Sequence, residues 1–264
     1  MSEPPVLSVE RLRFEYEGAP VLEDLSFEVG RGEVFVIVGP SGCGKSTLLR
    51  LALGLLRPTS GTIRVLGRDP SAGPPEALRS LHRRIGVLFQ GAALFSSMTL
   101  EDNVAAPVRE HTTLPDRLVR TLARMKLASV GLDASRGHHP SEASGGMRKR
   151  AGIARALALD PEVLFLDEPS AGLDPVTAGG LDDLILYLKE RIGLTQIVVS
   201  HELPSIFRIA DRILMLREGR IIAEGSREDI LYSQDPRVLD FLLRNAPDLE
   251  AGREALEATR EPAS

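Results

Sequence analysis

The sequence predicts an α/β fold, in which a largely parallel sheet is covered by helices, and three observations lead to this prediction. First, the continuous apolar run Val34–Val38 ends at a glycine, Gly39, as expected for a strand that is covered on both faces. Second, segments with strand patterns alternate with segments with helix patterns, both before and after a central stretch that lacks this alternation. Third, strand signals fade in that stretch, from Gly91 to Ser144, which predicts a helical lobe inserted into the core at about residues 91–150.

The N-terminal elements are expected to form an antiparallel β lobe. Val6–Phe14 and Val21–Val29 alternate apolar and polar residues, as half-buried strands do, and the turn-like segment Glu17–Pro20 separates them. After the apolar run Val34–Val38, a helix is expected over Lys45–Leu53. Further strands are expected at residues 62–66, 84–89, 163–166 and 196–199, and a closing hairpin at 213–216 and 220–223.

Helices are expected between and after these strands. Residues 115–128 show helical spacing of the apolar residues Leu118, Leu122 and Met125. Other helices are expected at about residues 147–159 and 176–191, and two short ones follow the hairpin, the second opened by Asp235-Pro236. For residues 245–264, a weak helix that docks on a partner and a solvated end remain alternatives.

Composition narrows the class of protein. With 264 residues, 43% of them hydrophobic, the chain can bury the core of one large domain with subsidiary lobes. The net charge of −5 offers no basic surface, so no nucleic-acid partner is expected. A single cysteine excludes an intrachain disulfide and fits a reducing cytosol. No secretory signal and no apolar run of about 18 residues is present, so a partner would have to bring the chain to a membrane.

A phosphate-binding loop is the clearest motif. Residues 39–46 match G-x-x-x-x-G-K-[ST] and lie between a predicted strand and a predicted helix. Lys45 is expected to reach the β- and γ-phosphates of a nucleoside triphosphate, and Ser46 to ligate Mg²⁺. Cys43 fits a small filler better than a redox sensor. The residues expected to bind the nucleotide here are Gly39, Pro40, Ser41, Gly42, Cys43, Gly44, Lys45, Ser46 and Thr47.

Two adjacent carboxylates, Asp167 and Glu168, end an apolar strand, where they would ordinarily repel each other. Mg²⁺ removes this conflict, because Asp167 can hold the ion's ligand shell while Glu168 polarises the attacking water. A solvated turn after a buried strand is the alternative for these residues alone. With the phosphate loop upstream, the catalytic interpretation is favoured.

Polar residues also follow two other predicted strands. Gln90 is expected to contact Mg²⁺ or the lytic water, and His201 to donate a hydrogen bond to the γ-phosphate. Taken alone, a glutamine at this place is more often just a polar residue that ends a strand, and a histidine is more often a capped or surface residue. Only their place in the ordered set of motifs supports the catalytic roles.

Ser144, Gly145 and Gly146 open a predicted helix, and three cations follow at residues 148–150. Cations in a first helical turn oppose the helix dipole, so we expect an anion nearby, and a second nucleotide's triphosphate would serve. A flexible glycine linker before a basic surface helix is the alternative.

Together with Phe165–Pro169, Ala171–Asp174 and Ser200-His201, these motifs resemble the nucleotide-binding domain of ATP-binding-cassette transporters over about Val6–Gly225. The resemblance implies a RecA-like P-loop core over residues 1–225, with the β lobe and the inserted helical lobe, and a C-terminal extension over 226–264. It also implies that ATP and Mg²⁺ are the cofactors.

The resemblance further implies a head-to-tail homodimer in which each ATP touches the phosphate loop of one chain and Ser144, Gly145 and Gly146 of the other. Tyr16 would stack on adenine, unless it packs in the core. Asp174 would lie at the dimer seam.

A narrower resemblance, to the ATPase of Mla-type lipid transporters, is carried by Met147 and by the segments Phe89–Phe95, Asn103-Val104, Pro107–His111 and Asp235–Val238. It implies phospholipid transport between bacterial membranes, with a permease, an MCE-domain protein and possibly a small STAS-domain subunit as partners. The chain would then lie on the cytoplasmic face of the inner membrane, held there by the permease.

Three points stay open at this stage. An importer ATPase for another small solute is the nearest alternative function, and a soluble non-transport cassette ATPase is the next. Ala143 stands where the motif usually has leucine. Ala92, Ala93, Leu94 and Phe95 are candidates for the patch that docks on the membrane partner, with core packing as the alternative.

Overall fold

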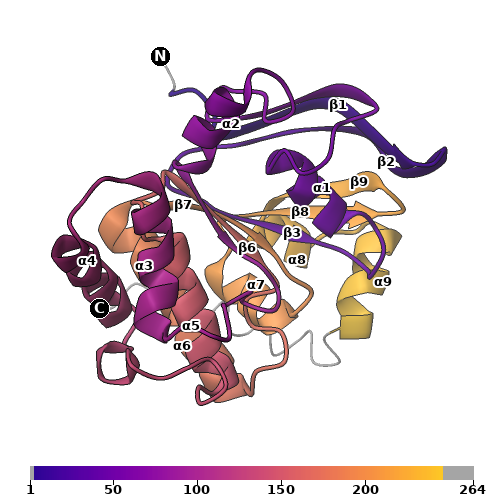
Figure 1. Ribbon diagram of the computed structural model, residues 1–264. Coiled ribbons are helices and arrows are strands. Elements are labelled where there is room, and N and C mark those ends of the chain that lie inside the picture. The colour runs from indigo at the N-terminus through magenta and orange to yellow at the C-terminus, as the bar shows by residue number, and fades with distance from the viewer. Residues whose placement is uncertain (1–2, 246–264) are drawn as a thin grey trace.

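In the computed structural model, which describes residues 3–245, six strands form the central sheet (Figure 1). Their order is β5 (Ile85–Leu88), β6 (Val163–Asp167), β7 (Thr195–Val199), β3 (Val34–Val38), β8 (Arg212–Arg217) and β9 (Arg220–Ser226). Neighbouring strands from β5 to β8 run parallel, and β9 pairs antiparallel with β8 in the expected hairpin. All five residues of β3 and of β7 are buried, because other elements cover both faces of the sheet.

A separate antiparallel sheet of β2 (Ala19–Val29), β1 (Leu7–Tyr16) and β4 (Ser60–Val65) forms the N-terminal lobe within the described part of the chain. Its inward residues pack with helix α1 (Lys45–Ala52) and with one face of the central sheet in a shared apolar core. The α/β class and the antiparallel lobe predicted from the sequence are therefore confirmed.

Helices cover the other face of the central sheet (Figure 1). The inserted lobe consists of α3 (Leu100–His111), α4 (Asp116–Ser129), a 3-10 turn at Asp133–Ser135 and α5 (Gly145–Ala156). The long helix α6 (Pro175–Ile192) and the short α7 (Leu203–Ile209) complete this layer. Val104 and Val119 of the lobe belong to the same apolar cluster as Leu164 and Leu166 of β6, so the lobe packs as part of the core.

The buried face of α4 differs from the expected one. Of the expected residues, Leu118 and Met125 are 41% and 62% exposed and Leu122 is half-buried against the core, whereas Val119, Ala123 and Leu127 are buried. Both sets of residues have helical spacing. Packing against α3 and α5 decides that Val119, Ala123 and Leu127 form the buried face of α4.

Three of the described helices have no expected range of their own in the sequence patterns: α3, which lies in the expected helical lobe, α2 (Pro75–His82) and α7. Helix α2 buries only Leu81, so its apolar period is too weak to predict it. Helix α7 has only seven residues. The two helices expected after the hairpin are present as α8 (Arg227–Leu231) and α9 (Pro236–Asn245), and α9 packs on the core through Val238, Phe241 and Leu242.

The rest of the predicted C-terminal extension, residues 246–264, lies outside the described residues. Among residues 3–245, the helices are all too short or too polar to span a lipid bilayer.

Candidate functional site

The predicted site residues follow four parallel strands. Strand β3 leads into the phosphate loop at Gly39, β5 is followed by Gln90, β6 ends at Asp167 next to Glu168, and β7 is followed by Ser200-His201. These strands lie in one parallel group, so their carboxyl ends meet at one edge of the sheet. The structure therefore brings these four motifs together, although Gly39 and His201 are 162 positions apart in the sequence.

The conformation of the phosphate loop requires glycine at its two ends. Gly39 has φ 150° and Gly44 has φ 105°. A β-carbon on Gly39 would lie 2.2 Å from the carbonyl oxygen of Leu216, and one on Gly44 would lie 2.4 Å from Cδ2 of Leu22. Helix α1 begins directly after the loop and has no acidic residue in its first turn, so its N-terminus keeps its positive potential.

Lys45 is buried against this loop. Its ammonium group donates to the carbonyl oxygens of Gly39, at 2.7 Å, and of Pro40, at 3.0 Å. The cation thus lies inside the loop that the motif predicts to surround the phosphates. Cys43 is also buried, and burial raises the pKa of its thiol, which fits a packing role.

Asp167 has the features expected of a cation ligand. Its Oδ1 is buried and has no hydrogen-bond partner among the described residues. Burial, followed by the neighbouring Glu168 charge, raises the pKa of Asp167 above its ordinary value. A buried carboxylate oxygen without a donor calls for a cation or a water. The sequence predicts that the Ser46 hydroxyl and the Gln90 amide join it as ligands, and hard oxygen donors of this kind are those that Mg²⁺ prefers.

Glu168 and His201 are in direct contact. The His201 Nδ1 lies 2.9 Å from both carboxylate oxygens of Glu168. The Glu168 backbone has φ 49°, in the left-handed region, and its N–H donates to the carbonyl of Val199 at 2.8 Å. Strained backbone of this kind is characteristic of functional sites, and here it directs the carboxylate toward the histidine.

Lys149 is a site contact that the sequence patterns did not indicate. This α5 residue is only 6% exposed, and its ammonium donates to the carbonyl oxygens of Gln90, at 2.5 Å, and Glu168, at 2.7 Å. Burial lowers the pKa of Lys149, and Glu168 is the foremost of the nearby carboxylates that oppose this. Gly146, Lys149 and Ile153 lie on the buried face of α5. Their spacing is the only feature of the sequence that indicates that Lys149 faces the core.

The side chains of the three cations at residues 148–150 all have hydrogen-bond acceptors within this chain, and an anion near them stays a prediction. Arg148 donates to the carbonyl of Ala143 at 2.6 Å, and Arg150 donates to those of Val130 and Gly180 at 3.2 and 2.6 Å. Lys149 donates to the carbonyls of Gln90 and Glu168. Carbonyl oxygens of this chain therefore accept hydrogen bonds from all three side chains.

Ser144 caps α5 and is exposed. Its hydroxyl oxygen accepts a hydrogen bond from the N–H of Met147 at 3.2 Å. Gly146 packs so closely that a β-carbon there would lie 2.3 Å from Cγ2 of Thr177. The turn is therefore held against the start of α6, while the side chain of Ser144 faces away from the packed core.

Tyr16 does not pack in the core. It is 42% exposed and makes an edge-to-face contact with Phe14, with ring centroids 4.7 Å apart. The core alternative for Tyr16 is therefore wrong. Its stacking on adenine stays a prediction, since Tyr16 is not among the residues that line the cavity described next.

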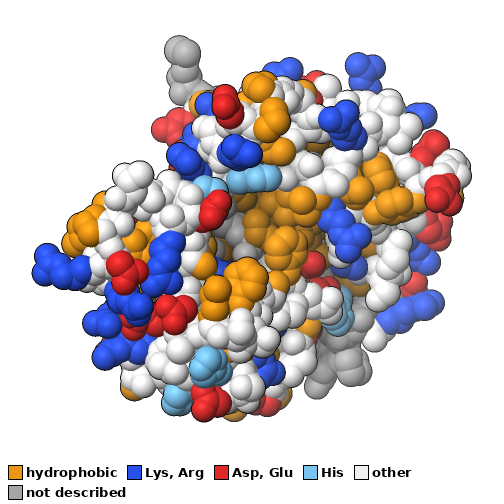
Figure 2. Space-filling model, viewed as in Figure 1, with side chains coloured by type: hydrophobic (Ala, Val, Ile, Leu, Met, Phe, Trp, Pro, Cys, Tyr) orange, Lys and Arg blue, Asp and Glu red, His pale blue; other side chains and the backbone are white. Residues whose placement is uncertain are grey.

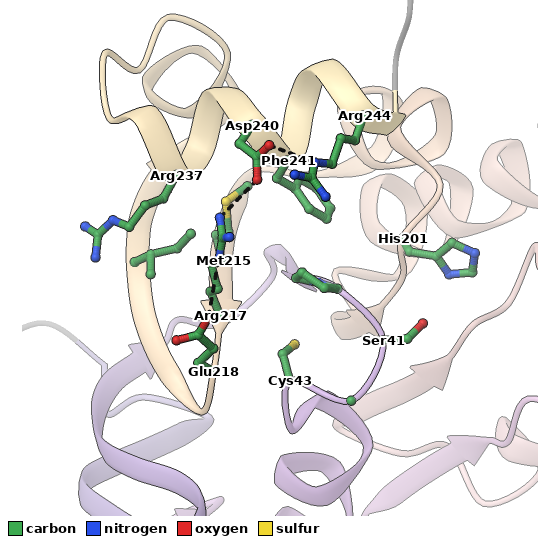
Figure 3. A pocket seen from close by; sticks show the side chains of 14 residues that line it. Ser41, Cys43, His201, Met215, Arg217, Glu218, Arg237, Asp240, Phe241 and Arg244 are labelled. Atoms are coloured by element: carbon green, nitrogen blue, oxygen red, sulfur yellow. Dashed lines mark hydrogen bonds and ion pairs between the residues drawn. The ribbon is translucent and has the colours of Figure 1, made fainter.

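A cavity of about 530 Å³ lies beside the phosphate loop (Figure 3). The loop and His201 form one side, and residues of β8 and α9 form the other, so the C-terminal helix supplies a wall that the sequence did not predict. Asp240 of α9 accepts hydrogen bonds from Arg217, at 3.2 Å, and Arg244, at 2.7 Å. Hydrogen bonds from Arg244 and then Arg217 hold the pKa of Asp240 below its ordinary value.

The predicted docking patch is only partly at the surface. Ala92 is buried in the core and Leu94 is half-buried against it, whereas Ala93 is exposed and Phe95 is 53% exposed. Figure 2 shows hydrophobic side chains gathered in a hollow in the middle of this face of the molecule. The core interpretation is therefore correct for Ala92.

Comparisons with known proteins agree with this geometry. A family model described as "ABC transporter" matches residues 22–171. The chain is 43% identical to the intermembrane phospholipid transport system ATP-binding protein MlaF of Haemophilus influenzae over 237 residues, which cover 90% of each chain. It is 41% identical to the probable ribonucleotide transport ATP-binding protein mkl of Mycobacterium tuberculosis over 236 residues, 89% of this chain and 66% of that one.

A solved structure of an ATP-binding cassette is also similar to this chain. The chain is similar to the ATP-binding cassette MJ0796 in its dimeric, post-hydrolysis state bound to ADP and Pi. The two share 28% sequence identity with a TM-score of 0.76, over 84% of this chain and 98% of that one.

Proposed function

This chain belongs to the ABC transporter family of ATPases, and from that premise we propose that it energises the movement of phospholipid between bacterial membranes. The observation that carries the catalytic part is the meeting of the phosphate loop, Gln90, Asp167-Glu168 and His201 at one sheet edge, with Glu168 and His201 in contact. The similarity to a phospholipid-transport ATPase over 90% of both chains supports the lipid substrate.

Each site residue then has a physical role. With a triphosphate inside the loop, the backbone N–H groups and Lys45 bind the phosphates, and Lys45 exchanges its loop carbonyls for phosphate oxygens. Glu168 orients the attacking water and accepts its proton, while His201 holds the carboxylate in place. Nδ1 of His201 faces Glu168, so Nε2 is the nitrogen left for the γ-phosphate.

Three residues of this site fit Mg²⁺: Ser46, Gln90 and Asp167. The ion, when bound, spreads the negative charge that develops on the phosphates. The buried, unpartnered oxygen of Asp167 supports this assignment most directly.

The site of one chain is incomplete in this proposal. Ser144, Gly145 and Gly146 lie on a different lobe and are not among the residues that line the cavity beside the phosphate loop. A second copy, arranged head to tail, would bring its own Ser144 to the γ-phosphate. The dimeric state of the similar cassette MJ0796 supports this arrangement.

The membrane is reached through partners in the same proposal. A permease would dock at the exposed part of the patch, Ala93 and Phe95, and hold the chain at the cytoplasmic face of the inner membrane. An MCE-domain protein and possibly a small STAS-domain subunit would complete the system. The similarity to a subunit of a phospholipid transport system supports partners at the membrane.

A second candidate substrate follows from the relative mkl, which is named for ribonucleotide transport. The ATPase subunit does not select between the two substrates, because the site proposed here binds the ATP that is hydrolysed and not the transported molecule. The cargo has to be identified on the assembled transporter.

The experiment is purification of the tagged full-length chain from detergent-solubilised membranes, followed by mass spectrometry of the bound proteins and small molecules. We expect a membrane permease and phospholipid. Phe95→Asp is the matched control, because it changes an exposed side chain and should lose permease and lipid together while the fold is kept. Recovery of ribonucleotide without lipid would contradict phospholipid as the transported substrate. Recovery of ribosomes or DNA would contradict a role in membrane transport.

A further inference from the structure

Helix α5 holds the main chain of two site segments through a buried cation, Lys149. The Lys149 ammonium donates to the carbonyls of Gln90 and Glu168, which are the residues proposed to bind Mg²⁺ and to activate water. It is buried, so these charge-assisted bonds are not weakened by competing solvent. Because Glu168 has φ 49°, a bond to its carbonyl fixes a backbone direction that the residue alone would rarely adopt.

A second α5 cation holds the other end of the same turn. Arg155 donates to the carbonyls of Ala92, at 2.8 Å, and Ala93, at 2.7 Å. Ala92 and Ala93 have φ 59° and 49°, so two consecutive non-glycine residues are in the left-handed region. The turn that carries Gln90 is thus fixed to α5 at both ends.

Close packing supports this attachment. A β-carbon on Gly152 of α5 would lie 2.6 Å from Cδ1 of Leu88 and 3.3 Å from Cβ of Ala92. There is no room for α5 to shift relative to the end of β5 without moving the turn. The helix and the turn therefore form one rigid unit.

The same helix begins at Ser144, which in the proposed dimer contacts the nucleotide of the opposite site. We propose that Lys149 is a positioning residue. It couples the main-chain positions of Gln90 and Glu168 to the position of α5, the helix that Ser144 caps. Engagement of Ser144 by the partner's nucleotide is thereby linked to hydrolytic competence in the chain's own site. This inference rests on the proposed function, because it assumes ATP hydrolysis at a shared site.

If Lys149 contributed only to the stability of the fold, its substitution would have a different effect, and Arg150 provides a matched control. Arg150, the next residue on α5, also donates to two main-chain carbonyls, those of Val130 and Gly180. Neither acceptor belongs to a predicted catalytic segment. Lys149→Met and Arg150→Met therefore each remove one α5 cation and two hydrogen bonds to carbonyls, but only the first loosens Gln90 and Glu168.

The test compares both variants with the wild-type full-length chain by ATPase kinetics, thermal unfolding and hydrogen exchange. For Lys149→Met we expect kcat to fall by about tenfold to a hundredfold with KM changed by less than about threefold, since misplacement affects the reacting geometry. Amides of residues 89–93 and 167–169 should exchange faster. Lys149→Arg, which keeps a cation, should restore part of kcat. Arg150→Met should keep kcat within about threefold even where its melting temperature falls equally.

Equal losses of kcat in the two methionine variants at equal melting temperature would overturn the proposal, and so would wild-type kcat in Lys149→Met. Hydrogen exchange separates this inference from the proposed function. If the wild-type chain hydrolyses no ATP, the function is wrong, whereas unchanged exchange at residues 89–93 and 167–169 in Lys149→Met shows that the positioning role is wrong.

Discussion

At the scale of single residues, Glu168 and its surroundings determine whether the site can hydrolyse a phosphoanhydride. The carboxylate is nearly buried, faces His201, and follows Asp167, whose buried oxygen has no donor among the described residues. A water that is held by Glu168 beside a bound γ-phosphate has a proton acceptor within reach. The strained φ of Glu168 shows that the fold maintains this arrangement at a cost.

Replacing Glu168 with glutamine is expected to keep ATP binding and to lower kcat by about 10²–10⁴-fold, because the amide fills the same space but cannot accept the proton. ATPase assays and a binding titration of the purified chain measure the two effects. We also expect an ATP-stabilised dimer in size-exclusion chromatography. Turnover at the wild-type rate would mean that Glu168 is not the general base.

At the scale of elements, α6 and α7 are joined by a buried polar contact next to the site. Asp182 of α6 is buried and accepts a hydrogen bond from the Ser205 hydroxyl of α7 at 2.9 Å. Helix α7 starts two residues after His201, so this contact fixes the segment that carries the histidine. Burial raises the pKa of Asp182, and the bond from Ser205 opposes this only in part.

The raised pKa predicts a pH dependence of stability. Because the folded-state pKa of Asp182 lies above its ordinary value of 3.8, its stabilising contribution is complete below that value and is lost as pH rises through the folded-state pKa. Asp182→Asn keeps an acceptor for Ser205 without the charge. The free energy of unfolding of this variant relative to wild type should therefore increase as pH rises from about 4 to about 8.

Urea unfolding at several pH values measures this difference. Asp183→Asn is the control on the same helix, since Asp183 is exposed and makes one surface ion pair with Arg208, whose loss should cost at most about 1 kcal/mol. A gap between Asp182→Asn and wild type that stays constant or narrows with pH would contradict the prediction.

At the scale of the whole molecule, the phosphate loop and Ser144 belong to different parts of the chain. The loop lies at the edge of the central sheet, and Ser144 caps a helix of the inserted lobe with its side chain exposed. In the proposed head-to-tail dimer, one copy supplies the loop and the second copy supplies Ser144 to the same nucleotide. A shared site of this kind makes the subunits of a dimer complement each other.

Two inactive variants are therefore expected to restore activity when mixed. Lys45→Ala removes the cation of the phosphate loop, and Ser144→Arg blocks the turn at the start of α5. Each homodimer has two defective sites, but a mixed dimer has one intact site, formed by Lys45 of one chain and Ser144 of the other. ATPase activity of the mixture should rise above that of both components. About a quarter of the wild-type value is the upper limit when half of the dimers are mixed, because linkage through α5 would lower turnover at a site whose own chain carries Ser144→Arg. A mixture no more active than its components would exclude the shared site.

Much of the fold and the site is determined by local sequence. The apolar run Val34–Val38 and the glycines that flank the loop predict a buried strand and a tight turn, and the structure confirms both. Polar residues that follow apolar strands mark the candidates after β5, β6 and β7, but for Gln90 and His201 only their place in the ordered set of motifs supports the catalytic roles. Patterns of this kind depend only on neighbours within a few residues, so they can be read without the fold.

Tertiary structure alone decided the contacts between distant segments. Lys149 meets Gln90 across 59 residues, and His201 meets Glu168 across 33, and neither pair has a spacing signal in the sequence. Which apolar stripe of α4 is buried was likewise decided by α3 and α5, because both stripes have the same period. The physical reason is common to all three: packing and burial select among partners that local propensity leaves equivalent.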